Sequence, residues 1–411
     1  MDMETDSSSE GDGDAAPQPI RVPIGHRPVI FPVPGSFDLT ARVLAHLGWQ
    51  RGLCSFKVFE NGEINAKVGE TVANHDVFVL YARDDENCEL NFSLVQLLFF
   101  VAAVRSESPH RLTVILPCLD YSRQDRRLHA GQGIPPQLLL RLLKGAGADR
   151  FLTTDLHNEA EAAFTPDLVV LDELSSLKYM SYYLRHELPG FDPTKAVVCA
   201  TNGGGLVLTR RMASELKTGF VMADRKRPKE GGTGEVKVIV SSPIDHMETI
   251  IIVDDMMDTC STMAEVCRAL HKMVPTAKIY GIAMHGYFCA NAHELMRDLV
   301  TNFGLQWIAV TNSVTQTGAL QRFADAGIEG RLKVVDISRM LAGAVGRIHL
   351  GASVNLPKFR SLSPADNDTM LQPCGSPGFA LARRGTDEGS LTSPRLGASA
   401  PPLLPPPGVP L

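Results

Sequence analysis

Residues 250–262 read IIIVDDMMDTCST, and this stretch decides which fold we expect the chain to adopt. Four β-branched residues lead into two aspartates, and such a run is too short for a buried helix but suits a strand covered on both faces. Beyond it, apolar residues recur with the spacing of one helical face. A buried strand, a tight polar turn and a helix N-terminus form the arrangement at which a parallel sheet binds a phosphorylated ligand.

The residue types of this turn fit a phosphorylated sugar. Backbone N–H groups at a helix start, beside the hydroxyls of Thr259, Ser261 and Thr262, can surround a phosphate monoester. Asp254 and Asp255 suit sugar hydroxyls or a magnesium ion, which proteins bind through few carboxylates plus substrate oxygens. The alternative is a strand followed by an acidic helix cap that binds nothing. A third aspartate in the same turn favours the ligand site.

Composition limits the class of protein. The chain has 411 residues, which is enough for two domains, and its 44% hydrophobic and 21% charged residues are ordinary for a soluble globular protein. A net charge of −6 argues against general nucleic-acid binding. Eight cysteines without a CxxC pair indicate free thiols in a reducing compartment. With no apolar run of membrane length and an acidic N-terminus, we expect a cytoplasmic protein without a membrane partner.

Strand and helix signals alternate through the middle of the chain. Residues 1–26 are acidic and residues 361–411 are rich in Pro, Gly and Ser, so we expect both tails to be disordered. The alternation predicts an α/β fold with parallel sheets flanked by helices, in two domains at 27–174 and 175–360. Strands are expected at 27–32, 77–81, 112–117, 151–155, 196–199, 218–223, 249–253, 278–283, 307–310 and 332–337, and helices at 38–47, 94–104, 135–144 and 206–216.

Two further polar stretches follow expected strands. Residues 121–127 (YSRQDRR) place three arginines within five positions, which is either a cationic fork for polyphosphate or a solvated surface run. Residues 155–157 (DLH) could share a magnesium ion or hold a phosphate chain, although a lone histidine at a strand end is more often structural. The residues alone leave both pairs of alternatives open.

Three loops complete the set of candidate ligand segments. Residues 201–205 (TNGGG) let backbone amides approach a ligand, unless they form only a tight turn. Residues 224–234 (DRKRPKEGGTG) suit a mobile cationic lid over an anionic substrate, or a bare surface loop. Residues 59–63 (FENGE) could stack on and hydrogen-bond a nucleobase, but taken alone they favour a hairpin turn with one buried Phe.

Together and in this order, these stretches resemble the ribose-phosphate pyrophosphokinase (phosphoribosyl diphosphate synthetase) family over residues 28–355. The shorter segments HG at 285–286, VTN at 310–312 and VDIS at 335–338 belong to the same resemblance. The acidic turn would fit any phosphoribosyltransferase, but those enzymes lack the RQDRR and DLH elements. The resemblance implies two phosphoribosyltransferase-type (Rossmann-like) domains, with ATP on the 27–174 side and ribose 5-phosphate on the 175–360 side.

The resemblance also implies a reaction and its partners. ATP and ribose 5-phosphate would give phosphoribosyl diphosphate and AMP for nucleotide biosynthesis, with Mg²⁺ as cofactor. The anomeric hydroxyl of the sugar would attack the β-phosphorus of ATP. Members of the family usually assemble as hexamers, so we expect a homo-oligomer or a hetero-oligomer with paralogues.

Site residues follow from the same resemblance. ATP would be bound by Phe59, Asn61, Glu63, Arg123, Gln124 and His157. Ribose 5-phosphate would be bound by Asn202, Asp254, Asp255, Asp258, Thr259, Cys260, Ser261 and Thr262. Catalytic cations would be Arg225, Lys226, Arg227 and His157, and the metal ligands would be His157, Asp155 and Asp172.

Four positions depart from the usual family pattern. Asn202 replaces an aspartate, Arg225 replaces the expected loop lysine, and Leu128 replaces a common acidic residue. Ser261 stands where the phosphate turn usually has glycine, so its Cβ would crowd the phosphate unless φ is negative. These departures make a catalytically impaired regulatory subunit the alternative to an active synthetase, with a phosphoribosyltransferase as a distant third. The intact aspartates and threonines of the turn favour the active enzyme.

Overall fold

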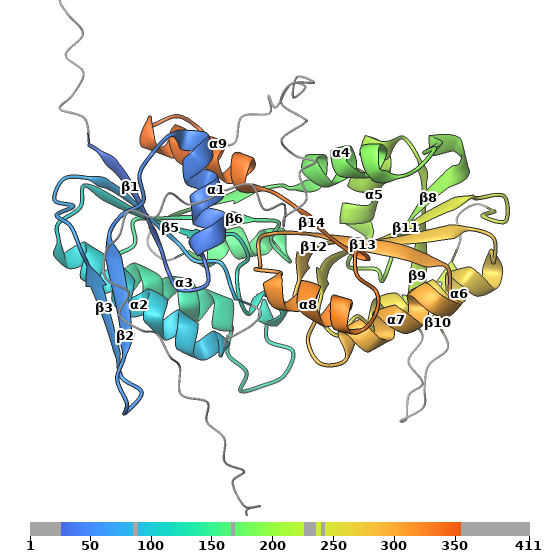
Figure 1. Cartoon of the computed structure of the whole chain (residues 1–411), viewed down its shortest axis with the longest axis horizontal. Helices are drawn as coiled ribbons and strands as arrows, with labels where there is room; N and C mark the ends of the chain where they lie inside the picture. Colours follow the sequence, from blue (N-terminus) through green and yellow to red (C-terminus); the bar gives the residue numbers. More distant parts are fainter. Residues whose placement is uncertain (1–25, 85–88, 166–168, 226–235, 240–242, 355–411) are drawn as a thin grey trace, which may run out of the picture. The chain divides into compact units, whose positions relative to one another are not determined.

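Two sheets built mainly of parallel strands form the framework of the protein (Figure 1). The structure is a computed structural model that describes residues 26–84, 89–165, 169–225, 236–239 and 243–354. The tails expected to be disordered lie outside these residues, except for His26. The predicted α/β fold with parallel sheets flanked by helices is confirmed.

The first sheet has the strand order β1-β4-β5-β6-β7, and all its neighbouring strands are parallel. Helices α2 (Leu90–Ser106) and α3 (Pro135–Ala146) pack on one face, against alternate side chains such as Val77 and Val114. Helix α1 (Phe37–Leu47) packs on the other face, against Phe78 and Ile115. The strands are β1 (Pro28–Pro32), β4 (Asp76–Leu80), β5 (Arg111–Leu116), β6 (Arg150–Thr154) and β7 (Val170–Leu174).

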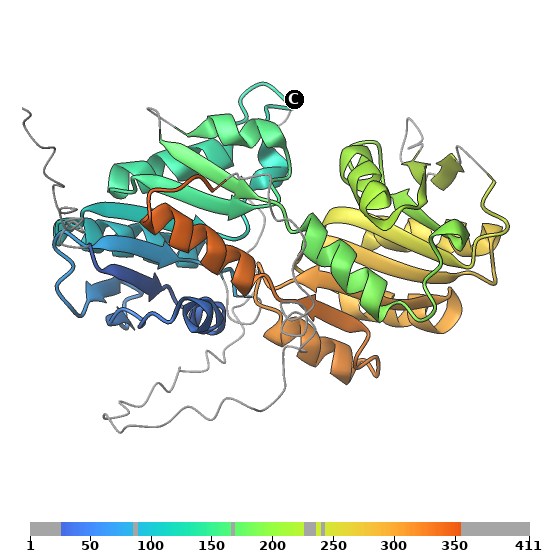
Figure 2. The same ribbon diagram turned by 90° about the horizontal axis from the view of Figure 1, so that it is seen from above.

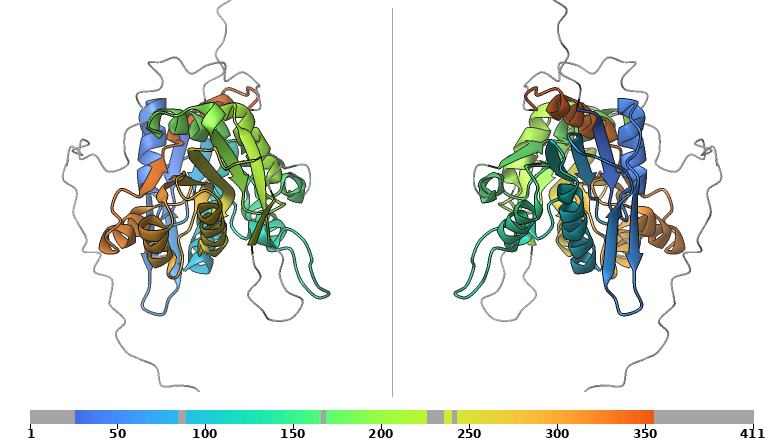
Figure 3. Two further views of the ribbon diagram at one scale, coloured as in Figure 1. Left: turned by 90° about the vertical axis from the view of Figure 1, so that its right-hand side faces the viewer. Right: turned by 90° about the vertical axis from the view of Figure 1, so that its left-hand side faces the viewer.

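The second sheet has the order β10-β9-β8-β11-β12-β13-β14, in which only the β10–β9 pair is antiparallel. Side chains of β11 alternate between the faces: Ile251 packs with α4 and α5, whereas Ile250 packs with α6, α7 and α8. Figure 3 shows helices on both sides of the sheet. The strands are β8 (Ala196–Ala200), β9 (Gly219–Arg225), β10 (Val236–Ile239), β11 (Thr249–Met257), β12 (Lys278–Gly286), β13 (Leu305–Thr311) and β14 (Leu332–Val335). The helices are α4 (Leu177–Glu187), α5 (Leu206–Leu216), α6 (Ser261–Met273), α7 (Ala292–Asn302) and α8 (Thr317–Asp325).

The last helix, α9 (Ser338–His349), follows the second sheet in sequence but packs beside α1 on the first (Figure 2). Arg111 in β5 donates to the carbonyl of Ile348 at 2.6 Å, and His349 Nδ1 lies 2.9 Å from Asp76 Oδ2 in β4. The predicted domain boundary after residue 174 coincides with the end of β7. Because α9 packs across that boundary, the division of the chain into 27–174 and 175–360 stays a prediction.

Strand β11 is longer than expected. The sequence predicts a strand at 249–253, whereas the structure extends it to Met257. The ladder with β12 continues through the pairs Asp254–Ala283 and Met256–His285, because the polar residues keep their backbone pairing. Asp254 and Asp255 therefore lie within the strand, on the scaffold of the sheet, and not in a loop after it.

A hairpin precedes β4. Its strands β2 (Cys54–Val58) and β3 (Ile64–Val68) are antiparallel and enclose the FENGE stretch at 59–63. Phe59 is 41% exposed, so the expected buried Phe is wrong at this position. Phe56 packs against helix α2 instead, with its ring centroid 4.9 Å from that of Phe100. No helix in the described ranges combines the length and apolarity needed to cross a membrane.

Candidate functional site

A pocket of about 420 Å³ lies where strands of both sheets end. Arg123 lies in the short helix η1 (Ser122–Gln124) after β5, and His157 follows β6 of the first sheet. Asn202 follows β8, and residues 254–263 come from β11, its turn and α6. Ligands of parallel α/β sheets bind at the carboxyl ends of strands. The pocket therefore combines most of the segments that the sequence singles out.

The turn between β11 and α6 has the features of a phosphate site. The first turn of α6 carries no acidic residue and no side-chain cap in the described chain, so its N–H groups can donate hydrogen bonds to an anion. The hydroxyls of Thr259 and Ser261 lie 3.1 Å apart at the same end of the helix. Helix N–H groups and hydroxyls together can donate several hydrogen bonds to one phosphate.

Backbone strain in this turn falls on Cys260 and not on Ser261. Cys260 has φ of 59°, in the left-handed region, whereas Ser261 is the first residue of α6 and has no positive φ. The Cβ of Ser261 is therefore not expected to crowd the phosphate, because a residue without a positive φ tolerates a Cβ. Tyr121 (φ 66°) and Asp155 (φ 44°), which also follow strand ends, are left-handed too. Such conformations cost about 1–3 kcal/mol each and cluster at functional sites.

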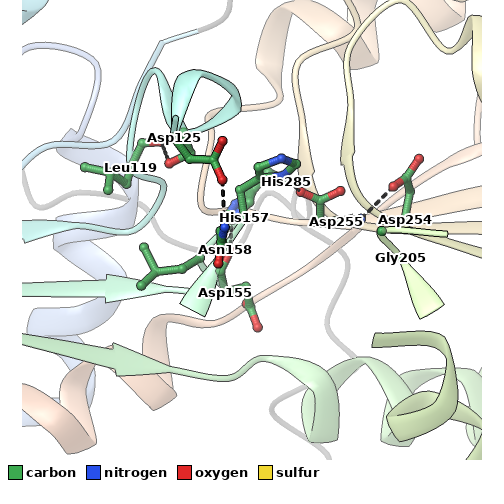
Figure 4. Close-up of polar contacts among 12 residues, drawn as sticks. Leu119, Asp125, Asp155, His157, Asn158, Gly205, Asp254, Asp255 and His285 are labelled. Carbon is green, nitrogen blue, oxygen red and sulfur yellow. Dashed lines mark hydrogen bonds and ion pairs between the residues drawn. The ribbon is translucent and has the colours of Figure 1, made fainter. Parts of the chain in front are cut away.

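Asp254 and Asp255 have opposite electrostatic environments. Burial, and then the charge of Asp255, raise the pKa of Asp254 to about 7, although the hydroxyl of Thr201 donates to Asp254 Oδ2 at 2.8 Å. Burial alone would raise the pKa of Asp255, but its ion pair with the His157 ring outweighs burial and lowers the pKa to about 2. The same hydrogen bond raises the pKa of His157 against the effect of burial. His157 and Asp255 therefore lie in the pocket as a hydrogen-bonded pair in which each favours the charged form of the other (Figure 4).

Arg123 reaches the phosphate turn from the first sheet. Its Nη1 atom donates to Asp258 Oδ2 at 2.6 Å. The arginine side chain is 48% exposed and the aspartate side chain 31% exposed, so solvent screens the pair. Of the stretch 121–127, only Arg123 lines the pocket, and Gln124 is exposed beside it.

Asn202 keeps the role in the turn that an aspartate would have. Its side-chain oxygen accepts hydrogen bonds from the backbone N–H groups of Gly204 at 2.8 Å and Gly205 at 3.1 Å. A carboxylate oxygen would accept the same two bonds, because both side chains present an oxygen at this position. The geometry of the turn before α5 therefore survives the replacement.

Several predicted site residues do not line this pocket. Phe59, Asn61 and Glu63 lie in the β2–β3 hairpin loop, where Asn61 Oδ1 accepts from the N–H of Glu63 at 3.1 Å. Arg225 ends β9, and Lys226 lies outside the described residues. Arg227 also lies outside them.

The structure does not bring the predicted metal ligands together. Asp172 accepts from Arg150 Nε at 2.5 Å, because the two residues lie on the neighbouring strands β7 and β6. Asp155 is buried and accepts from the N–H of Ser176 at 2.9 Å. His157 is paired with Asp255. Among the described residues, no group of three or more His, Cys, Asp or Glu side chains could hold a metal ion.

One buried residue that supports the site from behind was not predicted from the sequence. His285 is buried at the end of β12, with Nε2 3.0 Å from the carbonyl oxygen of Asp155 and Nδ1 2.7 Å from Ser313 Oγ. It thereby links the loop after β6 to the second sheet. The HG pair at 285–286 belongs to the family resemblance, but it did not indicate which residues His285 contacts.

The fold and this pocket define a class: α/β proteins of the phosphoribosyltransferase type, with an acidic phosphate turn between a central strand and a helix. Models of three domains match the chain: the N-terminal domain of ribose phosphate pyrophosphokinase at 29–147, a phosphoribosyl transferase domain at 179–296 and a phosphoribosyl synthetase-associated domain at 238–360. Together these matches cover residues 29–147 and 179–360, and they indicate the ribose-phosphate pyrophosphokinase family.

Relatives and a solved structure agree with this assignment. The chain is 29% identical to a ribose-phosphate pyrophosphokinase of Staphylococcus saprophyticus, over 80% of this chain and 95% of the relative. It is 28% identical to the corresponding protein of Staphylococcus haemolyticus over the same shares. The crystal structure of phosphoribosylpyrophosphate synthetase from Mycobacterium smegmatis has the same fold, with a TM-score of 0.69 at 24% identity, covering 79% of this chain and all of that one.

Proposed function

We propose that this chain is an active ribose-phosphate diphosphokinase. It would transfer the β,γ-diphosphoryl group of ATP to the anomeric hydroxyl of ribose 5-phosphate and release AMP. One observation carries the proposal: Arg123 and His157 from the first sheet line the same pocket as the acidic phosphate turn of the second. A phosphoribosyltransferase also has the turn, but it lacks the RQDRR and DLH elements that contain these two residues.

The acidic turn forms the ribose 5-phosphate half of the proposed site. The N–H groups at the start of α6 and the hydroxyls of Thr259 and Thr262 donate to the 5-phosphate, with Asp258, Cys260 and Ser261 supplying turn backbone. Asp254 and Asp255 accept hydrogen bonds from ribose hydroxyls, and Asn202 lies beside them.

The loops of the first sheet form the ATP half. Arg123 and Gln124 contact the phosphates, and Phe59, Asn61 and Glu63 contact the adenine. Arg225 ends β9, and we assign a catalytic role to its positive charge and to the charges of Lys226 and Arg227, which follow it in the sequence. A homo-oligomer remains part of the proposal, and its state can be measured by light scattering.

Charge neutralisation is the main chemical task of the proposed site. Phosphoryl-group transfer depends on positioning and on cations placed where negative charge develops. The hydrogen bond with Asp255 raises the pKa of His157, which favours the protonated ring that can donate to oxygens of the transferring group. Arg123 adds a second fixed cation, and its planar fork suits phosphate oxygens. The anomeric hydroxyl then meets the β-phosphorus between the two halves.

Mg²⁺ fits the donor set of the pocket. The ion is usually bound through one or two carboxylates together with substrate phosphates, and Asp254 and Asp255 offer such oxygens. When bound, it supplies positive charge beside the phosphates. A metal-binding histidine must be neutral, so the pairing of His157 with Asp255 favours a phosphate contact for the ring over its predicted metal role.

Two of the four departures from the family pattern do not disturb this pocket, so they no longer argue for an impaired subunit. Asn202 keeps the hydrogen bonds of the turn, and Ser261 has no positive φ. Leu128 is 66% exposed and does not line the pocket. These observations favour the active enzyme over the impaired regulatory subunit.

Turnover of the purified full chain tests the proposal. With Mg-ATP and ribose 5-phosphate we expect AMP and phosphoribosyl diphosphate, resolved by ³¹P NMR. The double variant Asp254→Asn/Asp255→Asn should fold but lose turnover. Nucleotide binding without turnover, across titrations of Mg²⁺ and phosphate, would favour the regulatory subunit. Release of diphosphate from phosphoribosyl diphosphate and a base would favour the phosphoribosyltransferase.

A further inference from the structure

Two loops that carry the cations of the pocket are joined by one side-chain hydrogen bond. Asn158 Nδ2 donates to Asp125 Oδ2 at 2.7 Å (Figure 4). Asp125 directly follows η1, which carries Arg123, and Asn158 directly follows His157. The bond thus connects the loop of His157 with the loop of Arg123.

Both partners of this bond are held in place by further contacts. Asn158 caps the short helix η2 (Glu159–Phe164), because its Oδ1 atom accepts from the N–H of Ala160 at 3.0 Å. The Asp125 side chain is only 10% exposed, so little solvent competes for the amide. A side chain that bonds with both its oxygen and its nitrogen has one fixed orientation. The geometry of Asn158 is therefore set by both loops at once.

A buried acid lies at the same contact. Glu161 of η2 is fully buried, and neither of its carboxyl oxygens has a hydrogen bond of ordinary geometry within the described chain. Burial raises the pKa of Glu161 to about 7, opposed by Ser122 of η1 and by His157. The charge of Asp125 raises that pKa further. A neutral amide is thus the compatible partner for Asp125, because another carboxylate here would face two acids.

We propose that the Asn158–Asp125 hydrogen bond is a brace that sets the spacing between Arg123 and His157. Both residues are positioning residues: neither lines the pocket, and each acts through a neighbour that does. The inference rests on the proposed function, because it assigns both cations to the phosphates of ATP. A displacement of about 1 Å at such a site can cost 100-fold in rate.

An exchange of the two side chains tests the brace. In Asn158→Asp the helix cap keeps its acceptor, but the donor is lost and a carboxylate faces Asp125. We expect kcat/KM for ATP to fall about 10- to 100-fold, while KM for ribose 5-phosphate stays within about twofold. In the double variant Asp125→Asn/Asn158→Asp, the amide at 125 can donate to the carboxylate at 158. The exchange should return kcat/KM to within about threefold of the wild type.

A matched control separates the brace from general effects. Asn302 donates to Asp298 at 2.8 Å in α7, which ends at the opposite edge of the sheet. Asn302→Ala removes a bond of the same chemistry and should leave both KM values unchanged. Tm is measured for every variant, so that a folding defect is recognised as such.

Nucleotide affinity keeps the test independent of turnover. If the wild type binds Mg-ATP by calorimetry but does not turn it over, the proposed function fails, and the brace still predicts weaker binding in Asn158→Asp and recovery in the exchange. Unchanged ATP kinetics and affinity in a folded Asn158→Asp chain would overturn the inference. So would an exchange that folds with the wild-type Tm but recovers neither quantity. A wild-type chain that binds no nucleotide would overturn both proposals.

Discussion

Arg123 Nη1 lies 2.6 Å from Asp258 Oδ2, although 135 positions separate the two residues in the chain. The arginine follows a strand of the first sheet, and the aspartate follows the central strand of the second. The pair joins the loop that we assign to ATP with the turn that we assign to ribose 5-phosphate. An arginine fork in this place can exchange a carboxylate for phosphate oxygens, since both accept the same hydrogen bonds.

Removal of this arginine should affect ATP more than the sugar. We expect Arg123→Ala to lower kcat/KM for ATP about 100- to 1,000-fold, the usual effect of losing one charge-stabilising donor. Steady-state kinetics with each substrate varied in turn measures the effect. The matched change Arg297→Ala, at an exposed arginine of α7, should have none. An equal loss in both variants would show that general charge, and not the position of Arg123, matters.

The pKa values of His157 and Asp255 should depend on each other. Asp255 raises the folded-state pKa of His157, so the contribution of the ring to stability is full below about pH 6.5 and is lost as pH rises through the raised value. Asp255, with its pKa lowered to about 2, contributes above about pH 4 and loses that contribution as pH falls through about 2. We expect Asp255→Asn to lower the His157 pKa measured by NMR. Asp245→Asn, beside His246, should not; an unmoved His157 pKa in Asp255→Asn would refute the pairing.

Asp254 should destabilise the fold when it ionises. Its folded-state pKa of about 7 exceeds the ordinary value, so the folded state binds an extra proton between about pH 4 and pH 7 and loses stability as pH rises through that range. We expect Asp254→Asn to raise the free energy of unfolding at pH 8 and to leave it nearly unchanged near pH 4. Urea unfolding at both values measures this. A variant that is less stable at pH 8 would contradict the buried environment of this carboxyl.

Ser261 should tolerate glycine without a gain in affinity. Its φ is not positive, so removal of the Cβ relieves no strain. We expect Ser261→Gly to change KM for ribose 5-phosphate by less than about threefold. The cost in stability should be below roughly 0.5–1 kcal/mol, the cost of glycine in a helix interior, because Ser261 is the first residue of α6. Kinetics and thermal unfolding measure the two effects. A tenfold fall in KM would show that the serine side chain crowds the phosphate.

The fold was largely predictable because its strands carry strong local signals. Buried parallel strands such as β8 and β11 are continuous apolar runs, which short-range pattern identifies. The β2–β3 hairpin was recognised only at its turn, since its strands alternate half-buried and exposed side chains. The packing of α9 on the first sheet depends on contacts with Asp76 and Arg111, more than 200 positions away, and no local pattern encodes them.

Candidate site residues could be selected where side chains that suit a ligand are consecutive in the sequence. The acidic turn, Arg123 and His157 line one pocket, and their binding roles stay predictions. The partnership of Asp172 with Arg150 and the brace between Asn158 and Asp125 were not predictable, because each depends on how neighbouring strand ends face one another. The left-handed backbone at Cys260 was not predicted, because the family resemblance places a glycine one position later, at Ser261.

The most direct test of the account is the product of a single reaction. Purified full-length protein is incubated with Mg-ATP and ribose 5-phosphate, and ³¹P NMR follows the phosphorus signals. The account predicts AMP and phosphoribosyl diphosphate in equal amounts, and none of either from the Asp254→Asn/Asp255→Asn variant. Absence of both products from a folded wild-type chain that binds Mg-ATP would contradict it.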